Sequence, residues 1–193
     1  MSNVDRYNGF TPSRHIGGGV IRANEYEIAD DYNTGIYSGD AVKLADTGIL
    51  QLASAGDTNL VGIFAGVQWI ADDGSVKFDK RWPASTSIKA GTKAKALVFD
   101  DPQIAFAVQC GGTTAFAQTM VGNNADLVAT HAGNDATGIS GQELNITTGI
   151  GATTAQFRIL GLIPRPDNDY GAKAKVEVML LETIMRPAGT AGI

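Results

Sequence analysis

Apolar and polar residues alternate along several short stretches of the chain, which is the pattern of β-strands that bury one face. In 174–180, for example, Val176 and Val178 alternate with Lys175 and Glu177. A sheet with one face in the core and the other in water produces this period of two. By the same criterion the sequence predicts nine strands: 20–28, 41–45, 49–53, 61–70, 76–82, 93–99, 104–110, 154–163 and 174–180.

Turn residues separate these predicted strands. An Asp-Gly pair at 73–74 stands between 61–70 and 76–82, and such a pair supplies the positive φ that a tight hairpin needs. The two strands are therefore expected to be antiparallel neighbours. Pro-containing turns at 100–102 and 164–171 separate the next predicted strand pairs in the same way. The alternation in 76–82 places three apolar side chains on one face, away from the charged ones, and these are Val76, Phe78 and Trp82.

The amino-acid composition favours the same architecture. Glycine accounts for 24 of the 193 residues, and Asp outnumbers Glu by fifteen to five. Gly and Asp form and end turns, whereas Glu extends helices. We therefore predict an all-β fold, a mainly antiparallel β-sandwich or barrel of about 8–10 strands, with at most one or two short helices and extended termini.

The regular pattern is confined to part of the chain. Residues 20–185 are predicted to form a single β-rich domain, preceded by an N-terminal arm, 1–19, and followed by a C-terminal tail, 186–193. Both ends are expected to be ordered only through neighbouring molecules, because they have little regular pattern. Within the domain, 111–151 is rich in Gly, Thr, Asn and Ala and is predicted to be a long loop or excursion. Inside it, 123–130 is either a short helix or a strand.

The charge and the scarce residue types exclude several classes of protein. A net charge of -5 argues against nucleic acid as a partner, because binding to phosphate backbones depends on clustered Lys and Arg. No apolar run approaches the roughly 18 residues of a membrane helix, and the first residues do not resemble a secretory signal. We therefore expect a soluble protein made in the cytoplasm, with no membrane partner. One cysteine and two histidines offer few metal ligands, so neither a metal nor a cofactor is predicted.

No arrangement of residues predicts catalysis. The glycines at 17–19 lack the Gly-Lys-Ser/Thr ending of a phosphate-binding loop, and Ser140 does not occupy the nucleophile position of a Gly-x-Ser-x-Gly turn. Cys110 ends an apolar strand and is expected to be a small buried side chain. A surface calcium site at 167–171 stays an alternative, although the ligand spacing of an EF-hand is absent. The sequence thus predicts no enzyme and no catalytic residue.

Six basic residues lie close together in the sequence. Polar alternation alone would produce a solvated face of a sheet, and the alternative is a docking surface for an acidic partner. Both interpretations stay open at this point. The six residues are Lys77, Lys80, Arg81, Lys89, Lys93 and Lys95.

Several strand and turn segments, taken in their order, resemble a known family. They are spread over most of the chain and are 9–19, 21–26, 39–44, 61–69, 82–86, 96–102, 154–161, 165–168 and 172–178. In this arrangement the chain resembles the small structural proteins that are encoded beside the major capsid gene of tailed bacteriophages. Such proteins are described as head decoration or cement proteins. None of the segments is a chemical motif, and 111–151 has no assigned place in the resemblance.

The resemblance implies a non-enzymatic protein on the capsid surface of the virion. Such a protein binds the outside of the assembled capsid, bridges subunits of the major capsid protein and stabilises the head against the pressure of packaged DNA. The expected partners are the major capsid protein and further copies of the chain itself, as a dimer or trimer. The alternative function is a β module on the virion that binds glycans or a host surface.

The residues expected at the capsid or oligomer interface include Arg and Trp, which are over-represented at positions that dominate binding. For Trp82, packing in the core is an equal alternative, and Trp69 is expected in the core because it belongs to an apolar run. The predicted interface residues are Arg14, His15, Arg22, Trp82 and Arg165.

Overall fold

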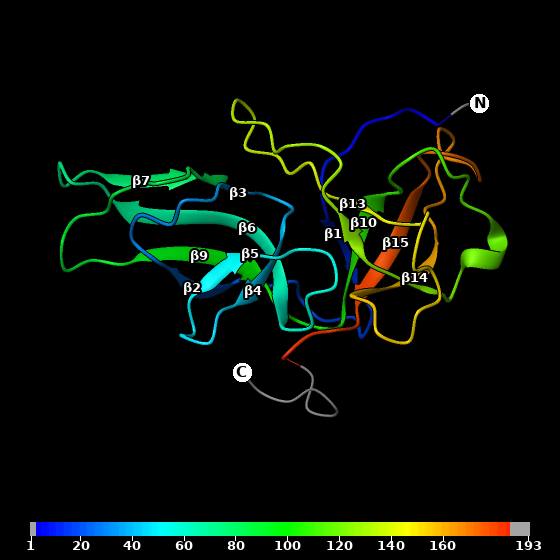
Figure 1. Cartoon of the computed structure of the whole chain (residues 1–193), viewed down its shortest axis with the longest axis horizontal. Coiled ribbons are helices and arrows are strands. Elements are labelled where there is room, and N and C mark those ends of the chain that lie inside the picture. The colour runs from blue at the N-terminus through cyan, green and yellow to red at the C-terminus, as the bar shows by residue number, and fades with distance from the viewer. Residues whose placement is uncertain (1–2, 186–193) are drawn as a thin grey trace.

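Two antiparallel β-sheets form the body of the molecule and lie next to each other along its long axis (Figure 1). The computed structural model describes residues 3–185. Within these residues the helical content is a single short 3-10 helix, η1 (Gln118–Met120). The all-β prediction is therefore confirmed. In the described part of the chain, no sheet closes into a barrel, and no helix is long and apolar enough to cross a membrane.

A six-stranded sheet forms one lobe. Its longest strand, β6 (Leu60–Ile70), pairs along one side with β9 (Ala94–Phe99). Along its other side β6 pairs first with β4 (Ala41–Leu44) and farther on with β7 (Val76–Asp79). All pairs in the sheet are antiparallel. The remaining strands are β2 (Asn24–Ile28) next to β9 and β5 (Leu50–Leu52) next to β4.

A five-stranded sheet forms the other lobe. Its two inner neighbours are β10 (Ile104–Gln109) and β15 (Lys175–Leu180). β14 (Phe157–Leu162) pairs with β15, and β11 (Asn124–Ala125) pairs with β14. The opposite edge is β1 (Thr11–His15), which pairs with β10. All these pairs are antiparallel, as are those of the six-stranded sheet.

Two short ladders stand beside the main sheets. β3 (Ile36–Tyr37) pairs with β8 (Arg81–Trp82), and β12 (Leu127–Val128) pairs with β13 (Glu143–Leu144). Each of these strands has two residues, which is too short for an alternating pattern to be recognised in the sequence.

Each of the nine stretches predicted as strands overlaps at least one observed strand. The alternation also predicted the buried faces of the five-stranded sheet. In β15, Val176 and Val178 are fully buried, while Lys175 and Glu177 lie on the other face. The predicted hairpin of β6 and β7 is confirmed as well.

The turn at 100–102 does not join neighbouring strands, so the prediction of a strand pair there is wrong. β9 already has β2 on one side and β6 on the other, which leaves no free edge for β10. The chain instead crosses from the six-stranded sheet to the five-stranded sheet at this turn. The Asp100 carboxylate holds the turn against β2, because it accepts hydrogen bonds from Asn24 Nδ2 and from the Tyr26 hydroxyl.

The face of 76–82 predicted to be apolar and buried is only partly buried. Trp82 is completely buried, but 55% of Val76 and 72% of Phe78 are exposed. The register explains the difference, because Lys77 lies opposite Trp69 and so shares the face of the β6–β7 hairpin that bears this buried side chain. Val76 and Phe78 therefore lie on the opposite, solvent-facing side of the hairpin.

The N-terminal segment is part of the body up to the end of β1, so the prediction of an arm over 1–19 is wrong for residues 3–15. Thr11–His15 forms the edge strand β1, and Phe10 is buried and stacked on Phe157 with ring centroids 4.3 Å apart. An edge strand whose side chains mostly face water has no apolar alternation. Pro12 lies next to a register shift, where a strand tolerates the missing N–H. The predicted tail, 186–193, lies outside the described residues.

Much of the segment 111–151 is packed into the five-stranded lobe, so its description as a loop or excursion is wrong for that part. Residues 134–140 form a loop without a named strand, and this loop contacts β3 and Arg81 of the six-stranded lobe. The segment contains η1 and the short strands β11, β12 and β13. Of the two alternatives for 123–130, the strand is correct. The segment contributes buried side chains to the core of this lobe, and these are Phe116, Ala125, Leu127, Leu144 and Ile146.

Two hydrophobic clusters fill the lobes, and β6 contributes to both. Val61, Phe64 and Val67 belong to the cluster under the six-stranded sheet. Leu60 and Ile63 belong to the cluster of the five-stranded lobe. Both faces of the first half of β6 are therefore buried, which explains why the sequence there is a continuous apolar run and does not alternate.

Buried polar contacts also join the lobes around Asp40. The Phe10 amide donates to the Gly39 carbonyl at 2.8 Å, and Gly9 and Gly39 both have positive φ where the two segments cross. The Asp40 carboxylate accepts hydrogen bonds from the Ser140 hydroxyl and, at 2.7 Å, from the Tyr37 amide. A Cβ on Gly9 would lie 2.5 Å from that of Ser140, so only glycine fits this crossing.

Candidate functional site

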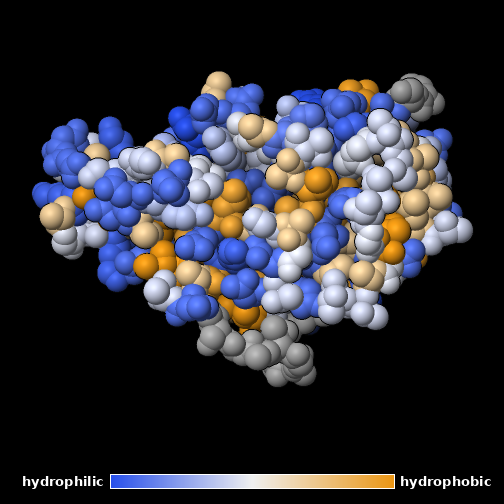
Figure 2. Space-filling view, in the orientation of Figure 1, coloured by the Kyte–Doolittle hydropathy of each residue, from blue (hydrophilic) through white to orange (hydrophobic). Residues whose placement is uncertain are grey.

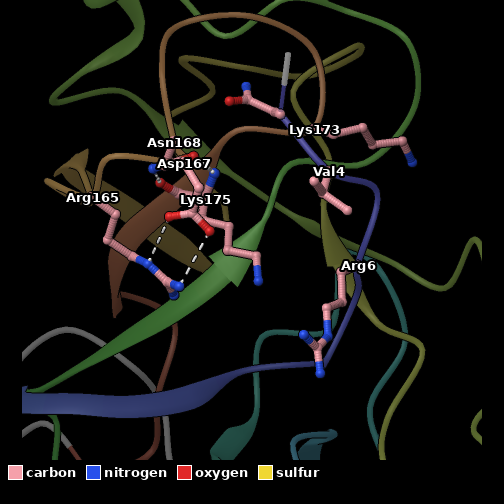
Figure 3. Close-up of a pocket in the computed structure, with 8 residues that line it drawn as sticks. Val4, Arg6, Arg165, Asp167, Asn168, Lys173 and Lys175 are labelled. Atoms are coloured by element: carbon pink, nitrogen blue, oxygen red, sulfur yellow. Dashed lines mark hydrogen bonds and ion pairs between the residues drawn. The ribbon is translucent and has the colours of Figure 1, made fainter. Parts of the chain in front are cut away.

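A groove with several positive charges lies on the outer face of the five-stranded sheet, between the N-terminal segment and the connection from β14 to β15 (Figure 3). It consists of two adjoining hollows of about 130 and 170 Å³. Both are lined by Arg6 from the N-terminal segment, Arg165 from the connection and Lys175 from β15. Ala107 and Ile163 add small and apolar surface. We call this feature the basic groove.

The N-terminal wall of the basic groove is held by long-range hydrogen bonds. The Asn3 side-chain amide donates to the carbonyls of Asp169 at 2.8 Å and Ala172 at 3.0 Å, and its oxygen accepts from the Asp169 amide at 2.9 Å. The Arg6 amide donates to Gln109 Oε1 at 2.7 Å. These contacts fix the backbone of the N-terminal segment and leave the Arg6 guanidinium exposed to solvent.

The opposite wall is shaped by one asparagine. Asn168 Nδ2 donates to the carbonyls of Ile163 and Lys175, and its Oδ1 accepts from the Lys175 amide. This side chain closes the connection between β14 and β15. Arg165 and Asp167 in the same connection form an exposed ion pair, with 3.2 Å between Nε and Oδ1. Exposed pairs of this kind contribute little free energy, so an incoming anion can compete for the guanidinium.

The charges in the basic groove are incompletely balanced. Within the described chain neither Arg6 nor Lys175 takes part in an ion pair, and Asp167 is committed to Arg165. Burial lowers the pKa of Lys175, and the neighbouring positive charges of Arg165 and Arg6 lower it further. An anion bound between these side chains would relieve this repulsion. The groove is therefore suited to a carboxylate or another anionic group.

A cluster of charged and polar side chains lies beside the groove and ties it to the body. Gln109 Nε2 donates to Asp5 Oδ1 at 2.7 Å and to Glu143 Oε1 at 2.8 Å. Lys173 Nζ lies 3.3 Å from Asp5 Oδ2 and 3.4 Å from Glu143 Oε1. Burial opposes the charge of Lys173, but the carboxylates of Glu143 and Asp5 outweigh it and raise the pKa of the ammonium.

Three residues of this cluster have the geometry of possible metal ligands. Ligand atoms of Asp5, His131 and Glu143 lie within 4.8 Å of one another. His131 Nε2 and Glu143 Oε2, 3.6 Å apart, are both buried and have no hydrogen bond within the described residues. A divalent cation there would lie next to the Lys173 ammonium, which already contacts both carboxylates. We therefore interpret the cluster as an ion-pair network that holds the N-terminal segment.

The two nucleophiles considered from the sequence, Cys110 and Ser140, are held in structural roles. Cys110 is completely buried, and burial, with a smaller contribution from Glu143, raises the pKa of its thiol to about 12. The Ser140 hydroxyl donates to Asp40 and accepts from the Gln142 amide. The prediction that Cys110 is a buried side chain is confirmed. The chemistry that the basic groove offers is ionic binding.

The structure places the predicted interface residues in different surroundings. Arg14 on β1 is exposed and forms a bidentate pair with Glu177 of β15. His15 is largely buried, and both of its ring nitrogens have partners. Its Nε2 lies 3.0 Å from Asp101 Oδ2, and its Nδ1 accepts a hydrogen bond from the Gly19 amide. His15 therefore stabilises the turn that follows β1 and offers little contact surface. Arg22 is exposed in the segment before β2.

Trp82 is not available for a surface contact, so that prediction is wrong. The side chain is buried in the six-stranded lobe, where its ring meets Trp69 edge-on at 5.8 Å. Its Nε1 donates to the Tyr32 carbonyl. The alternative of core packing is correct for Trp82, and the prediction of core packing for Trp69 is confirmed. Of the five predicted interface residues, Arg165 is the one that lines the basic groove.

The basic cluster of 77–95 lies on the six-stranded lobe and is partly neutralised by ion pairs. Hydrophilic residues cover most of that end of the molecule in the view of Figure 2. Half of the cluster is ion-paired, and these pairs are Arg81 with Asp135, Lys93 with Glu27 and Lys95 with Glu25. These pairs favour the interpretation as a solvated face over a docking surface for an acidic partner.

The sequence did not single out Arg6 or Lys175. Lys175 was visible only as a polar position in an alternating strand, and Arg6 belongs to a segment without pattern. Their convergence depends on two asparagines. The Asn3 side chain bonds to residues that are distant in sequence, and the Asn168 side chain closes the connection between β14 and β15.

Comparison with known protein families, with characterised proteins and with solved structures finds no match for this chain. The basic groove is therefore interpreted from its own geometry and charge.

Proposed function

We propose that the protein is a non-enzymatic decoration protein of a tailed bacteriophage. It binds the outside of the assembled capsid, bridges subunits of the major capsid protein and stabilises the head against the pressure of packaged DNA. The proposal is supported by the resemblance of nine strand and turn segments to this family. It is further supported by a body of paired strands with a docked N-terminal segment, because a cement protein acts through rigid shape.

The basic groove is the proposed docking site for an acidic segment of the major capsid protein. The observation that carries this assignment is the convergence of Arg6, Arg165 and Lys175 in a chain whose net charge is -5. The two arginine side chains are exposed, and a guanidinium forms bidentate hydrogen bonds with a carboxylate. Ala107 and Ile163 allow the incoming segment to approach the sheet closely.

Repetition over the shell makes a modest contact effective. A stable interface of ordinary size buries on the order of 1,600 Å² in total. A protein that bridges two capsid subunits also gains effective concentration from its first contact, which strengthens the second without new chemistry. The groove supplies charge and orientation, and the surrounding surface supplies the remaining contact area.

Binding to purified empty heads of the phage that encodes the chain tests the proposal. We expect saturable binding at a fixed ratio to the major capsid protein and a higher temperature of head disruption. Arg6→Glu and Arg165→Glu should each weaken binding about tenfold or more, because each places a negative charge where an acidic segment docks. Lys89→Glu is the matched control, since it makes the same kind of charge change on the other lobe.

Three results would count against the proposal. No binding to heads would exclude the decoration role. Equal binding by the groove variants and by the control would exclude the basic groove as the docking site. Binding to glycans without binding to heads would support the alternative function on a host surface.

A further inference from the structure

The strand β7 has one unpaired edge and an exposed apolar face. It pairs with β6 on one side, and no described strand pairs with its other side. All four of its residues are exposed, including Val76 and Phe78, whose large apolar side chains face solvent. In Figure 1, β7 lies at the margin of the six-stranded lobe. Exposed strand edges are sites where a further strand can add, so natural proteins cover or protect them.

The hairpin hydrogen bonds decide which backbone groups of β7 point outward. The Ala71 amide donates to the Ser75 carbonyl, which makes these two residues a hydrogen-bonded pair. Hydrogen-bonded and non-hydrogen-bonded pairs alternate along an antiparallel ladder. The backbone groups of Lys77 and Asp79 therefore point toward β6. Those of Val76 and Phe78 point away from the sheet and are available to another strand.

We propose that β7 pairs with β7 of a second copy of the chain, antiparallel and with the two-fold axis at Phe78. In this register Phe78 lies directly opposite Phe78 of the second copy, and the outward backbone groups of both residues bond to each other. Lys77 then lies opposite Asp79 of the second copy, and Asp79 opposite its Lys77. Val76 lies opposite Lys80, whose alkyl chain can cover it. The pairing joins the two six-stranded sheets into one.

Charge selects this register among the symmetric alternatives. An axis at Lys77 would place two ammonium groups opposite each other, and an axis at Asp79 would place two carboxylates opposite each other. Like charges directly opposite in a sheet are destabilising, whereas opposite charges stabilise it. An axis at Val76 would pair Phe78 with Gly74 and leave Lys77 without an acidic partner. The axis at Phe78 is therefore the one that pairs every charge on β7 and stacks the two aromatic rings.

The same charge pattern indicates that the strand added to β7 belongs to a second copy of the chain. The segment Val76–Asp79 is complementary to itself when it is reversed, which is what a two-fold symmetric interface requires. The proposal adds a named surface to the self-association expected of a decoration protein. Its test uses the isolated chain without capsids, so it succeeds or fails independently of the proposed function.

Position-specific disulfide formation in the full chain tests the register. In a hydrogen-bonded pair the Cα atoms are about 5.5 Å apart, which lies within the range of a disulfide. Phe78→Cys should therefore give a covalent dimer under mild oxidation. Val76→Cys is the matched control, because the two copies of this position would be four residues out of register, about 13 Å apart, and should not cross-link. The native Cys110 is buried and does not interfere.

Charge reversal tests the same pairing by a second route. Lys77→Asp places two acids opposite each other, and Asp79→Lys places two bases opposite each other, so each variant should lower the dimer fraction measured by sedimentation. The double variant Lys77→Asp/Asp79→Lys restores opposite charges and should restore the dimer. Lys89→Asp, at an exposed lysine outside β7, should leave the dimer fraction unchanged. Thermal unfolding of each variant verifies that it is folded.

Any of three results would overturn the proposal. A chain that stays monomeric at all concentrations would show that β7 does not pair with itself. Equal cross-linking of Phe78→Cys and Val76→Cys would exclude the register, and a double reversal that fails to restore the dimer would exclude the charge pairing. A monomer whose Phe78→Ser variant no longer binds heads would assign this edge to the capsid protein instead.

Discussion

Asp40 is a buried carboxylic acid at the junction of the two lobes, and its replacement by asparagine tests how the junction responds to pH. The carboxylate accepts hydrogen bonds from the Ser140 hydroxyl and the Tyr37 amide. In Asp40→Asn the side-chain oxygen can still accept from the Tyr37 amide, while the new NH₂ group donates to the Ser140 hydroxyl. The variant therefore keeps the contacts and removes the ionisation.

The size of the effect follows from the pKa of Asp40. Burial raises this pKa from 3.8 to about 6, although the hydrogen bonds from Ser140 and Tyr37 lower it in part. One unit of difference in pKa corresponds to about 1.4 kcal/mol, so the difference between folded and unfolded chain corresponds to about 3 kcal/mol. Because the folded pKa is raised, this stability is fully present below pH 3.8 and is lost as the pH rises through about 6.

Urea unfolding of the native chain and of Asp40→Asn, followed by tryptophan fluorescence between pH 3.5 and 7.5, measures this difference. The free energy of unfolding of Asp40→Asn minus that of the native chain should increase by about 3 kcal/mol as the pH rises from 3.5 to 7.5, mostly between pH 4 and 6. Asp46→Asn, at an exposed position away from the junction, is the control for the loss of one carboxylate. Parallel profiles for Asp40→Asn and the native chain would refute the assignment of a buried, titrating acid at the junction.

Three further predictions concern the N-terminal segment, the outer sheet face and the core. Phe10→Ala should lower the free energy of unfolding by about 3–5 kcal/mol. At concentrations where the chain is monomeric, Phe78→Ala should change it by about 0.5 kcal/mol or less, and equal effects of the two variants in urea unfolding would contradict the docked N-terminus. Arg14→Ala should raise the pKa of Glu177 in an NMR titration, because the Arg14 guanidinium lowers it, and an unchanged value would refute the bidentate pair. Cys110 should not react with a thiol reagent at pH 8 until the chain is unfolded in urea, and rapid labelling of the native chain would contradict its burial.

The main strands could be predicted because apolar residues mark the buried positions in their sequences and polar residues mark the exposed ones. In β15, Val176 and Val178 face the core while Lys175 and Glu177 do not, and this difference repeats every second residue. The same signal fails where burial does not alternate. β1 has mostly exposed side chains, and β11, β12 and β13 are too short for any period to appear.

Pairing between distant strands was not predictable from the pattern. The turn at 100–102 resembles a hairpin turn in sequence, yet it connects two sheets because both edges of β9 are already occupied. The alternation in β7 was recognised, but its buried face was assigned incorrectly. That assignment depends on the register with β6, which places Lys77 opposite Trp69.

The candidate site was predicted only in part. Arg165 was expected at an interface, and it lines the basic groove. Arg6 and Lys175 join it because Asn3 and Asn168 fix the two walls through hydrogen bonds that span the fold. Such contacts have no signature in the local sequence. Trp82 was assigned to the surface or the core with equal weight, since a single aromatic residue at the end of a strand fits both.

A cryo-electron microscopy reconstruction of empty heads incubated with the protein tests the central claim most directly. We predict that the protein occupies the outer surface of the shell at regular positions, with Arg6, Arg165 and Lys175 facing an acidic segment of the major capsid protein. A bare shell at saturating protein concentration, or bound protein whose basic groove faces the solvent, would contradict the account.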